Sequence, residues 1–261
     1  MLRSLKQVKD LKIHAFDGEI GSVDYFFFDD EGWAIRYFVI NTGNWLTGRQ
    51  VLISPYSVNR VDWIGGDLFL SLTKEQVQGS PDIDVLRPIS RQNEVAFMNY
   101  YDYPFYWGST EVAGMLPPPQ LQPRAESVAQ AASASTQTSR SNPDNPDVPT
   151  DSHLRSTQTV SSYPIAATDG DLGHVEDFIV DDEIWAIRYL VIATRTWWPG
   201  KKVLVAPQWI ESVDWRDSKV HVNLTREAIK GSPEFSESAL ISREYENQLY
   251  RYYGHPPYWN E

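Results

Sequence analysis

Hydrophobic and aromatic residues occur in short runs separated by turns rich in glycine and aspartate. The strongest run is 33–40, where both faces of an extended strand are mostly apolar and Arg36 is the exception. Such a strand is typical of the centre of a closed or covered sheet. Weaker runs predict further strands at 22–28, 50–54, 58–63 and 68–72.

Helical signals follow the last of these strands. Thr73 precedes Gln76 in the spacing of a capping box, and Gly79 is expected to end that helical turn. Ser90 is expected to cap a second helix, and Ser242 occupies the same place later in the chain.

The whole pattern occurs twice, with every pair of matching positions offset by 152 residues. Residues 13–107 and 165–259 share 41 identities in 95 positions without a gap. The repeated motifs include D-G-x-x-G, D-D-E-x-W-A-I-R-Y, V-D-W, G-S-P and I-S-R. The chain therefore contains two copies of one domain, whereas a solenoid would need at least three shorter units.

The segment between the copies has a different composition. Residues 108–160 are rich in proline, serine, threonine and alanine and poor in large apolar residues, so they predict a flexible linker. We expect one domain at 1–107 and a second at 161–261. Each contains five or six short strands and a C-terminal helical segment, giving a mainly β protein. A strand set this small buries both faces most easily as a barrel.

Charge and composition narrow the function. Lys and Arg total 23 against 35 Asp and Glu, a net charge of −12, which disfavours direct nucleic-acid binding. The chain has no cysteine, which excludes disulfides, thiolate metal sites and cysteine nucleophiles. No apolar run approaches the ~18 residues of a membrane span, and charges interrupt the N-terminus. We therefore expect a soluble, cytoplasmic protein.

Several of these motifs resemble the PRC-barrel family. They are the D-G-x-x-G turn, the strand ending in D-D, the W-A-I-R-Y strand and the G-[RK]-x-V-L-[IV]-x-P segment, in family order in both copies. The family includes the cytoplasmic domain of the photosynthetic reaction-centre H subunit and the C-terminal domain of a ribosome-maturation factor. The resemblance covers roughly 5–107 and 157–259. It implies a small β-barrel that acts in protein interaction or assembly, and it implies no reaction.

No catalytic constellation is visible in the sequence. The five histidines form no spaced pairs, and nucleophile-elbow, phosphate-loop and dinucleotide motifs are missing. The acidic clusters 29–31 and 181–183 suit either a carboxylate or cation site or, as we expect, solvated hairpin tips. We therefore expect no enzyme activity, no cofactor and no metal.

Two arginines lie on an otherwise apolar strand face and need counter-ions. These are Arg36 and Arg188. Asp62 and Asp214 are plausible partners, and the turn aspartates are the alternative. A structural ion pair is the favoured interpretation, and an interface anchor is the other.

Aromatic residues supply the candidate contacts for a partner. Trp45, Trp197 and Trp198 lie in loops, as lids over the barrel or exposed anchors. The tails that contain Tyr106 with Trp107 and Tyr258 with Trp259 either pack across the barrel or dock a partner.

The leading hypothesis is a non-enzymatic adaptor with a protein partner. Its two barrels either pair with each other, as a pseudo-dimer, or engage two sites on the partner. Homodimerisation is a further possibility, and we expect each half to fold alone. One alternative is an accessory subunit at the periphery of a photosynthetic or electron-transport membrane complex. Another is a ribosome or RNA-processing assembly factor.

Overall fold

The computed structural model describes residues 1–46, 48–83, 89–107, 153–194, 201–237 and 239–260. The first repeat comprises β1 (Leu2–Ser4), α1 (Leu5–Lys9), β2 (Lys12–Ala15), β3 (Gly18–Asp29), β4 (Ala34–Asn41), β5 (Gln50–Ile53), η1 (Pro55–Ser57), β6 (Val58–Asp62), β7 (Asp67–Leu70), α2 (Lys74–Gln78) and α3 (Arg91–Tyr101). The second comprises β8 (Leu154–Ser156), α4 (Thr157–Val160), β9 (Pro164–Ala167), β10 (Gly170–Asp181), β11 (Ile187–Ala193), β12 (Lys202–Val205), η2 (Pro207–Trp209), β13 (Ile210–Asp214), β14 (Lys219–Val222), α5 (Arg226–Gly231), α6 (Arg243–Tyr253) and η3 (Tyr258–Asn260).

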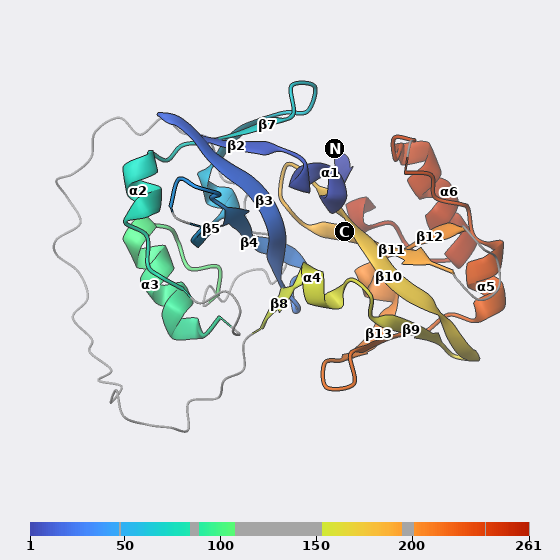
Figure 1. Ribbon diagram of the computed structural model, residues 1–261. Coiled ribbons are helices and arrows are strands. Elements are labelled where there is room, and N and C mark those ends of the chain that lie inside the picture. The colour runs from blue at the N-terminus through green and yellow to red at the C-terminus, as the bar shows by residue number, and fades with distance from the viewer. Residues whose placement is uncertain (47, 84–88, 108–152, 195–200, 238, 261) are drawn as a thin grey trace.

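The described strands form two seven-stranded sheets, so the mainly β class is confirmed. The strand order is β5-β4-β3-β2-β7-β6 in one sheet and β12-β11-β10-β9-β14-β13 in the other. Within each path only the β2–β7 and β9–β14 pairs are parallel. The long strands β3 and β10 cross the middle of the molecule, and helices α2, α3, α5 and α6 lie on its two outer flanks (Figure 1).

Each sheet takes its seventh strand from the other repeat. Strand β1 pairs with β10, and its register sets Leu2 opposite Asp181. Strand β8 pairs with β3 in the same way, with Leu154 opposite Asp29. Residues 154–160 are therefore a strand and a short helix, although their composition suggested a linker. In the rest of that segment, residues 108–152 lie outside the described residues.

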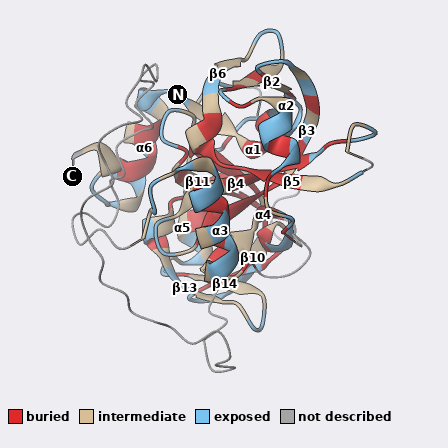
Figure 2. Ribbon diagram, turned by 90° about the vertical axis from the view of Figure 1, so that its left-hand side faces the viewer, coloured by how far each residue is buried: buried red, intermediate tan, exposed pale blue. Residues whose placement is uncertain are grey.

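The strand predicted at 33–40 is β4, and it lies inside its sheet, between β3 and β5. Its two faces enter different clusters, because successive side chains of a strand point to opposite sides. Tyr37 and Val39 pack with Phe97 and Met98 of α3. Phe38 belongs instead to a core that continues through both repeats. Buried residues concentrate on the central strands that this core joins (Figure 2).

The glycine that closes the D-G-x-x-G motif is required by close packing. A Cβ on Gly21, whose φ is +141°, would lie 2.0 Å from the carbonyl oxygen of Asn41. A Cβ on Gly173 would lie at the same distance from the carbonyl oxygen of Ala193. The backbones of adjacent strands approach too closely at this point for any side chain.

The predicted helix starts are confirmed. Thr73 and Gln76 form a complete capping box, and the Gly79 N–H donates to the Glu75 carbonyl at the end of that turn. Ser90 and Ser242 cap α3 and α6 through their hydroxyls. None of the helices in the described ranges combines the length and apolar character needed to cross a membrane.

Candidate interaction surfaces

The aromatic tail of the first repeat is anchored on a buried carboxylate. Glu94, on α3, is only 3% exposed. It accepts hydrogen bonds from the hydroxyls of Tyr37 at 3.2 Å and Tyr106 at 2.5 Å, and pairs with Arg91 at 2.9 Å. The Arg36 guanidinium lies 4.0 Å from the centre of the Tyr106 ring. The tail is thus tied to the outer face of the sheet.

The second repeat has the same arrangement. Glu246 accepts from Tyr189 at 2.7 Å and from Tyr258 at 3.1 Å, and pairs with Arg243 at 3.1 Å. Arg188 lies 4.0 Å from the centre of the Tyr258 ring. These contacts favour the packing interpretation of both tails over partner docking.

Burial controls the ionisation of these groups. Desolvation raises the pKa of the Glu94 carboxyl above its ordinary value, although its tyrosine and arginine partners act in the opposite direction. Burial, together with the Glu94 charge, raises the pKa of Tyr106, and burial raises the pKa of Tyr258 to about 12. The two tyrosines therefore stay protonated at neutral pH and can donate to the carboxylates.

The last tail residues also pack against the protein. Trp107 lies under Arg91 and Trp259 under Arg243, with charge-to-ring distances of 4.1 Å and 4.0 Å. Both indoles are half-buried. Cation–π contacts of this kind stabilise the tails where they lie.

The arginine on β4 pairs with a turn aspartate and not with Asp62. Arg36 Nη2 lies 2.9 Å from Asp29 Oδ2. Asp29 ends β3, the direct neighbour of β4, whereas Asp62 lies on β6 at the far end of the sheet order. The Asp62 carboxylate instead accepts from the N–H groups of Ile64 and Gly65 and closes their turn.

The equivalent aspartate of the second repeat has the same turn role. Asp214 accepts from the N–H groups of Arg216 and Asp217, each at 2.9 Å. This local role accounts for Asp62 and Asp214 without Arg36 or Arg188. Local backbone donors are reached first because they lie two and three residues away.

Trp45 is half-buried and packs against the shared core. The Lys74 ammonium lies 5.2 Å from the centre of its ring. This placement favours the lid interpretation for Trp45. Trp197 and Trp198 lie outside the described residues.

The acidic hairpins contact the other repeat through their middle residues. The expectation of solvated tips is wrong for these residues and also for Asp29, which is 7% exposed. Arg155 Nε donates to Asp30 Oδ2 at 2.7 Å, and Arg3 Nε lies 3.6 Å from Asp182 Oδ2. The side chains of Asp30 and Asp182 are only 9% and 11% exposed. Each arginine belongs to the strand that crosses over from the other repeat.

Each of these arginines also rests on a tryptophan of its own repeat. Arg3 lies 4.5 Å from the centre of the Trp63 ring, and Arg155 lies 4.3 Å from that of Trp215. The sequence interpretation missed both arginines. The signal was present, because L-R-S occurs at 2–4 and again at 154–156, at the common offset of 152.

Two apolar residues of the first repeat are strongly exposed to solvent at turns. Phe16 is 85% exposed and Ile64 is 101% exposed. Phe16 connects β2 to β3, and its N–H donates to the Leu72 carbonyl at 2.7 Å. Ile64 lies in the turn that Asp62 closes. Both side chains are therefore presented by backbones held in place by hydrogen bonds.

The second repeat builds the same two turns with polar residues. Thr168 replaces Phe16, and its N–H donates to the Leu224 carbonyl at 3.0 Å. Arg216 replaces Ile64, and its N–H donates to Asp214 Oδ1 at 2.9 Å. The fold therefore requires neither apolar side chain. The two turns that contain Phe16 and Ile64 are called the exposed apolar turns below.

No model of a protein family matches the chain, and no curated protein matches it. Within the described ranges, no group of three or more histidine and carboxylate side chains is placed to hold a metal ion.

Proposed function

We propose that this protein is a non-enzymatic protein-binding module built from two PRC-type β-barrels. The motif order of both repeats supports the barrel assignment, as does a sheet order in which β6 and β5 occupy opposite ends and are joined by the short η1. The family resemblance supports a role in assembly. The two repeats act as one body, because each sheet contains a strand of the other repeat and one core extends through both.

One observation carries the proposal: Phe16 is 85% exposed at a position where the other repeat makes the same backbone hydrogen bond with threonine. An aromatic ring in water is unfavourable, and the ring has no role in its own turn. A rigidly presented aromatic side chain loses little conformational entropy on binding, which suits an anchor in a partner's pocket. Ile64 is a second apolar side chain of the same kind.

Site-specific photocrosslinking tests the proposal in cells of the source organism. A photoreactive benzoyl-phenylalanine is introduced in place of Phe16 and, as the matched control, in place of Thr168. We expect a discrete adduct from position 16 that is missing from position 168. Equal labelling from the two positions, or none from position 16, would contradict a partner surface on the first repeat.

Exchange of the turn residues then measures the contribution of the exposed apolar turns. The variants Phe16→Thr and Ile64→Arg copy the second repeat, so unfolding free energies should change by less than about 0.5 kcal/mol. Affinity for the crosslinked partner should fall at least about tenfold for an anchor residue. An unchanged affinity in the folded double variant would contradict the proposal.

The identity of the adduct also separates the three kinds of partner. A subunit of a photosynthetic or electron-transport membrane complex would favour the accessory role. A ribosomal protein would favour the assembly-factor role, and the acidic charge of this chain suits a basic protein surface better than RNA itself. Another protein would support the general adaptor.

A further inference from the structure

The segments that exchange between the repeats lie at the beginning of each repeat. Strand β1 pairs with β10 of the second repeat, and α1 contacts both β10 and β3 before the chain returns to its own sheet as β2. Residues 154–160 run along β3 of the first repeat and return as β9. We infer that these segments, together with the core that both repeats share, hold the repeats together without the covalent connection. We also infer that the edge of β3 and the edge of β10 each select the segment of the unlike repeat.

The edge of β3 that receives residues 154–160 needs a hydroxyl from the crossing segment. A register shift between Val23 and Tyr25 precedes Phe26, which is 1% exposed. The Phe26 N–H donates to Thr157 Oγ1 at 3.1 Å, and this hydroxyl lies 3.2 Å from the Phe26 carbonyl oxygen. The equivalent of Thr157 in the first repeat is Leu5, which has no acceptor. A first-repeat segment on β3 would leave a buried N–H unpaired.

The edge of β10 that receives the N-terminal segment does not need that hydroxyl. The N–H of Phe178, the equivalent of Phe26, donates to Asp177 Oδ1 at 2.8 Å. The Ser4 hydroxyl donates to the other oxygen of Asp177. Leu5 is 3% exposed and belongs to the shared core. The first repeat has Tyr25 where the second has Asp177. The equivalent backbone N–H groups of Phe26 and Phe178 are therefore paired in different ways.

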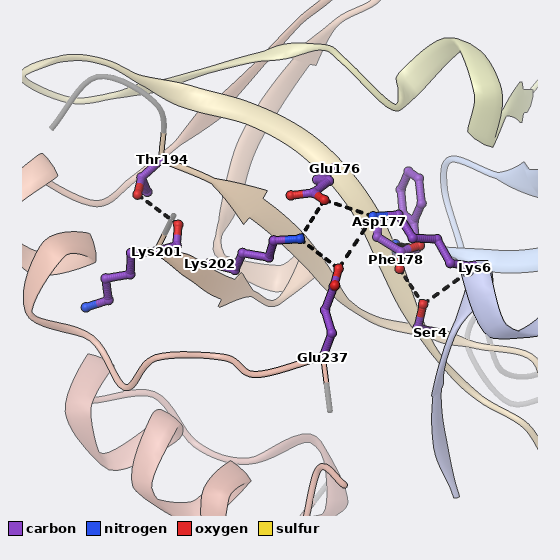
Figure 3. A network of polar contacts seen from close by, with 9 residues as sticks. All are labelled: Ser4, Lys6, Glu176, Asp177, Phe178, Thr194, Lys201, Lys202 and Glu237. Carbon is purple, nitrogen blue, oxygen red and sulfur yellow. Dashed lines mark hydrogen bonds and ion pairs between the residues drawn. The ribbon is translucent and has the colours of Figure 1, made fainter. Parts of the chain in front are cut away.

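The edges of β3 and β10 also differ in the charged side chains beside them. Lys6 Nζ lies 2.9 Å from Glu176 Oε1 and 3.5 Å from Glu237 Oε1. Lys202 Nζ lies 2.6 Å and 2.7 Å from the same two oxygens. Two lysines and two glutamates thus form a neutral cluster, with Lys6 contributed by the crossing segment (Figure 3).

Pairing of two second repeats would leave this cluster unbalanced. Gln158 is the equivalent of Lys6, so two carboxylates would share one lysine. On β3 the equivalents of Glu176 and Lys202 are Asp24 and Gln50, whose side chains bond to each other at 2.8 Å. The edge of β3 therefore accepts a segment with the neutral Gln158 without loss of an ion pair. Hydrogen bonding and charge therefore select the same, unlike pairing.

The test uses the full chain with a sequence-specific protease site inserted between residues 108 and 152. The folded protein is cut, and its two pieces are followed by size-exclusion chromatography with light scattering. We expect them to elute together at the mass of the intact chain at micromolar concentration. Separate elution would overturn the inference that the repeats hold together without the covalent connection.

Selection is measured by mixing a cut chain whose N-terminal piece is tagged with an untagged cut chain. The tagged piece should capture untagged C-terminal pieces and at least about tenfold fewer untagged N-terminal pieces. Equal capture of both pieces would overturn the selection of unlike repeats.

Variants of the crossing segments locate the selection. Thr157→Val removes the hydroxyl and should raise the dissociation constant of the cut pair at least about fivefold, the value of one buried hydrogen bond. Thr159→Val, on the exposed side of the same helix, is its control. Lys6→Glu should weaken the pair more than Lys9→Glu, which changes an exposed lysine of α1 by the same charge. If each variant matches its control, the assigned contacts do not select the pairing.

Discussion

Ala34 and Ala186 form an antiparallel bridge, although they are the same position of the two repeats. On either side of this bridge, the Ile35 N–H donates to the Trp185 carbonyl at 2.8 Å and the Ile187 N–H donates to the Trp33 carbonyl at 2.7 Å. A residue that meets its own equivalent marks a two-fold axis. The repeats are therefore arranged as a symmetric dimer within one chain, and the exchange of β1 and β8 follows the same symmetry.

The first prediction concerns Gly21, the glycine of β3 that packs closely against β4. Gly21→Ala should destabilise the protein by more than about 3 kcal/mol, since the new Cβ would lie 2.0 Å from the Asn41 carbonyl oxygen and the backbone must move. Gly43→Ala is the control, because no atom lies within 4 Å of its added Cβ. Its φ of +53° alone should cost about 1 kcal/mol. Urea unfolding measures both, and equal losses would contradict the packing argument.

The second prediction concerns the carboxylate beneath the aromatic tail. Glu94→Ala removes the acceptor of two tyrosine hydroxyls, and Tyr37 is 0% exposed, so we expect a loss of about 2–4 kcal/mol. Glu94→Gln keeps an acceptor oxygen and should lose less than half as much. Gln92→Ala, at an exposed position of the same helix, is the control. The role of the carboxylate would be contradicted if Glu94→Ala unfolded at the same urea concentration as this control.

The third prediction is a pH dependence at the interface between the repeats. Burial raises the pKa of the Asp177 carboxyl above its ordinary value, against the opposing effects of Ser4, the Phe178 N–H and Lys6. The folded state therefore binds this proton more tightly than the unfolded state. Its stabilising effect is complete below the ordinary pKa and is lost as the pH rises through the raised value.

Asp177→Asn removes this titration while keeping an oxygen for the Phe178 N–H. The variant should gain stability relative to the original protein as the pH increases from 3 to 7, and the gain should vanish at the acid end. Thermal unfolding over this range measures the difference. A difference that is constant with pH would show that Asp177 does not titrate as its burial requires.

Much of the fold could be predicted from local patterns. The duplication, the central strand around Tyr37 and the helix caps at Thr73 and Ser90 each depend on neighbours in sequence, and the structure contains all of them. The candidate contacts were harder to predict. Arg36 clearly needed a carboxylate, but the choice of Asp29 over Asp62 depends on which strands are adjacent.

Two copies of one β domain follow from the sequence alone, because periodicity and turn chemistry are local and each motif occurs twice. The completion of each copy's sheet by a strand of the other copy is visible only in the folded structure. The segments 2–4 and 154–156 are identical, so their strand propensity says nothing about which sheet they join. That choice is made by groups brought together over long sequence separations, such as the Phe26 N–H with Thr157 and Lys6 with Glu176. Hydrogen bonds and ion pairs of this kind exist only after the chain has folded.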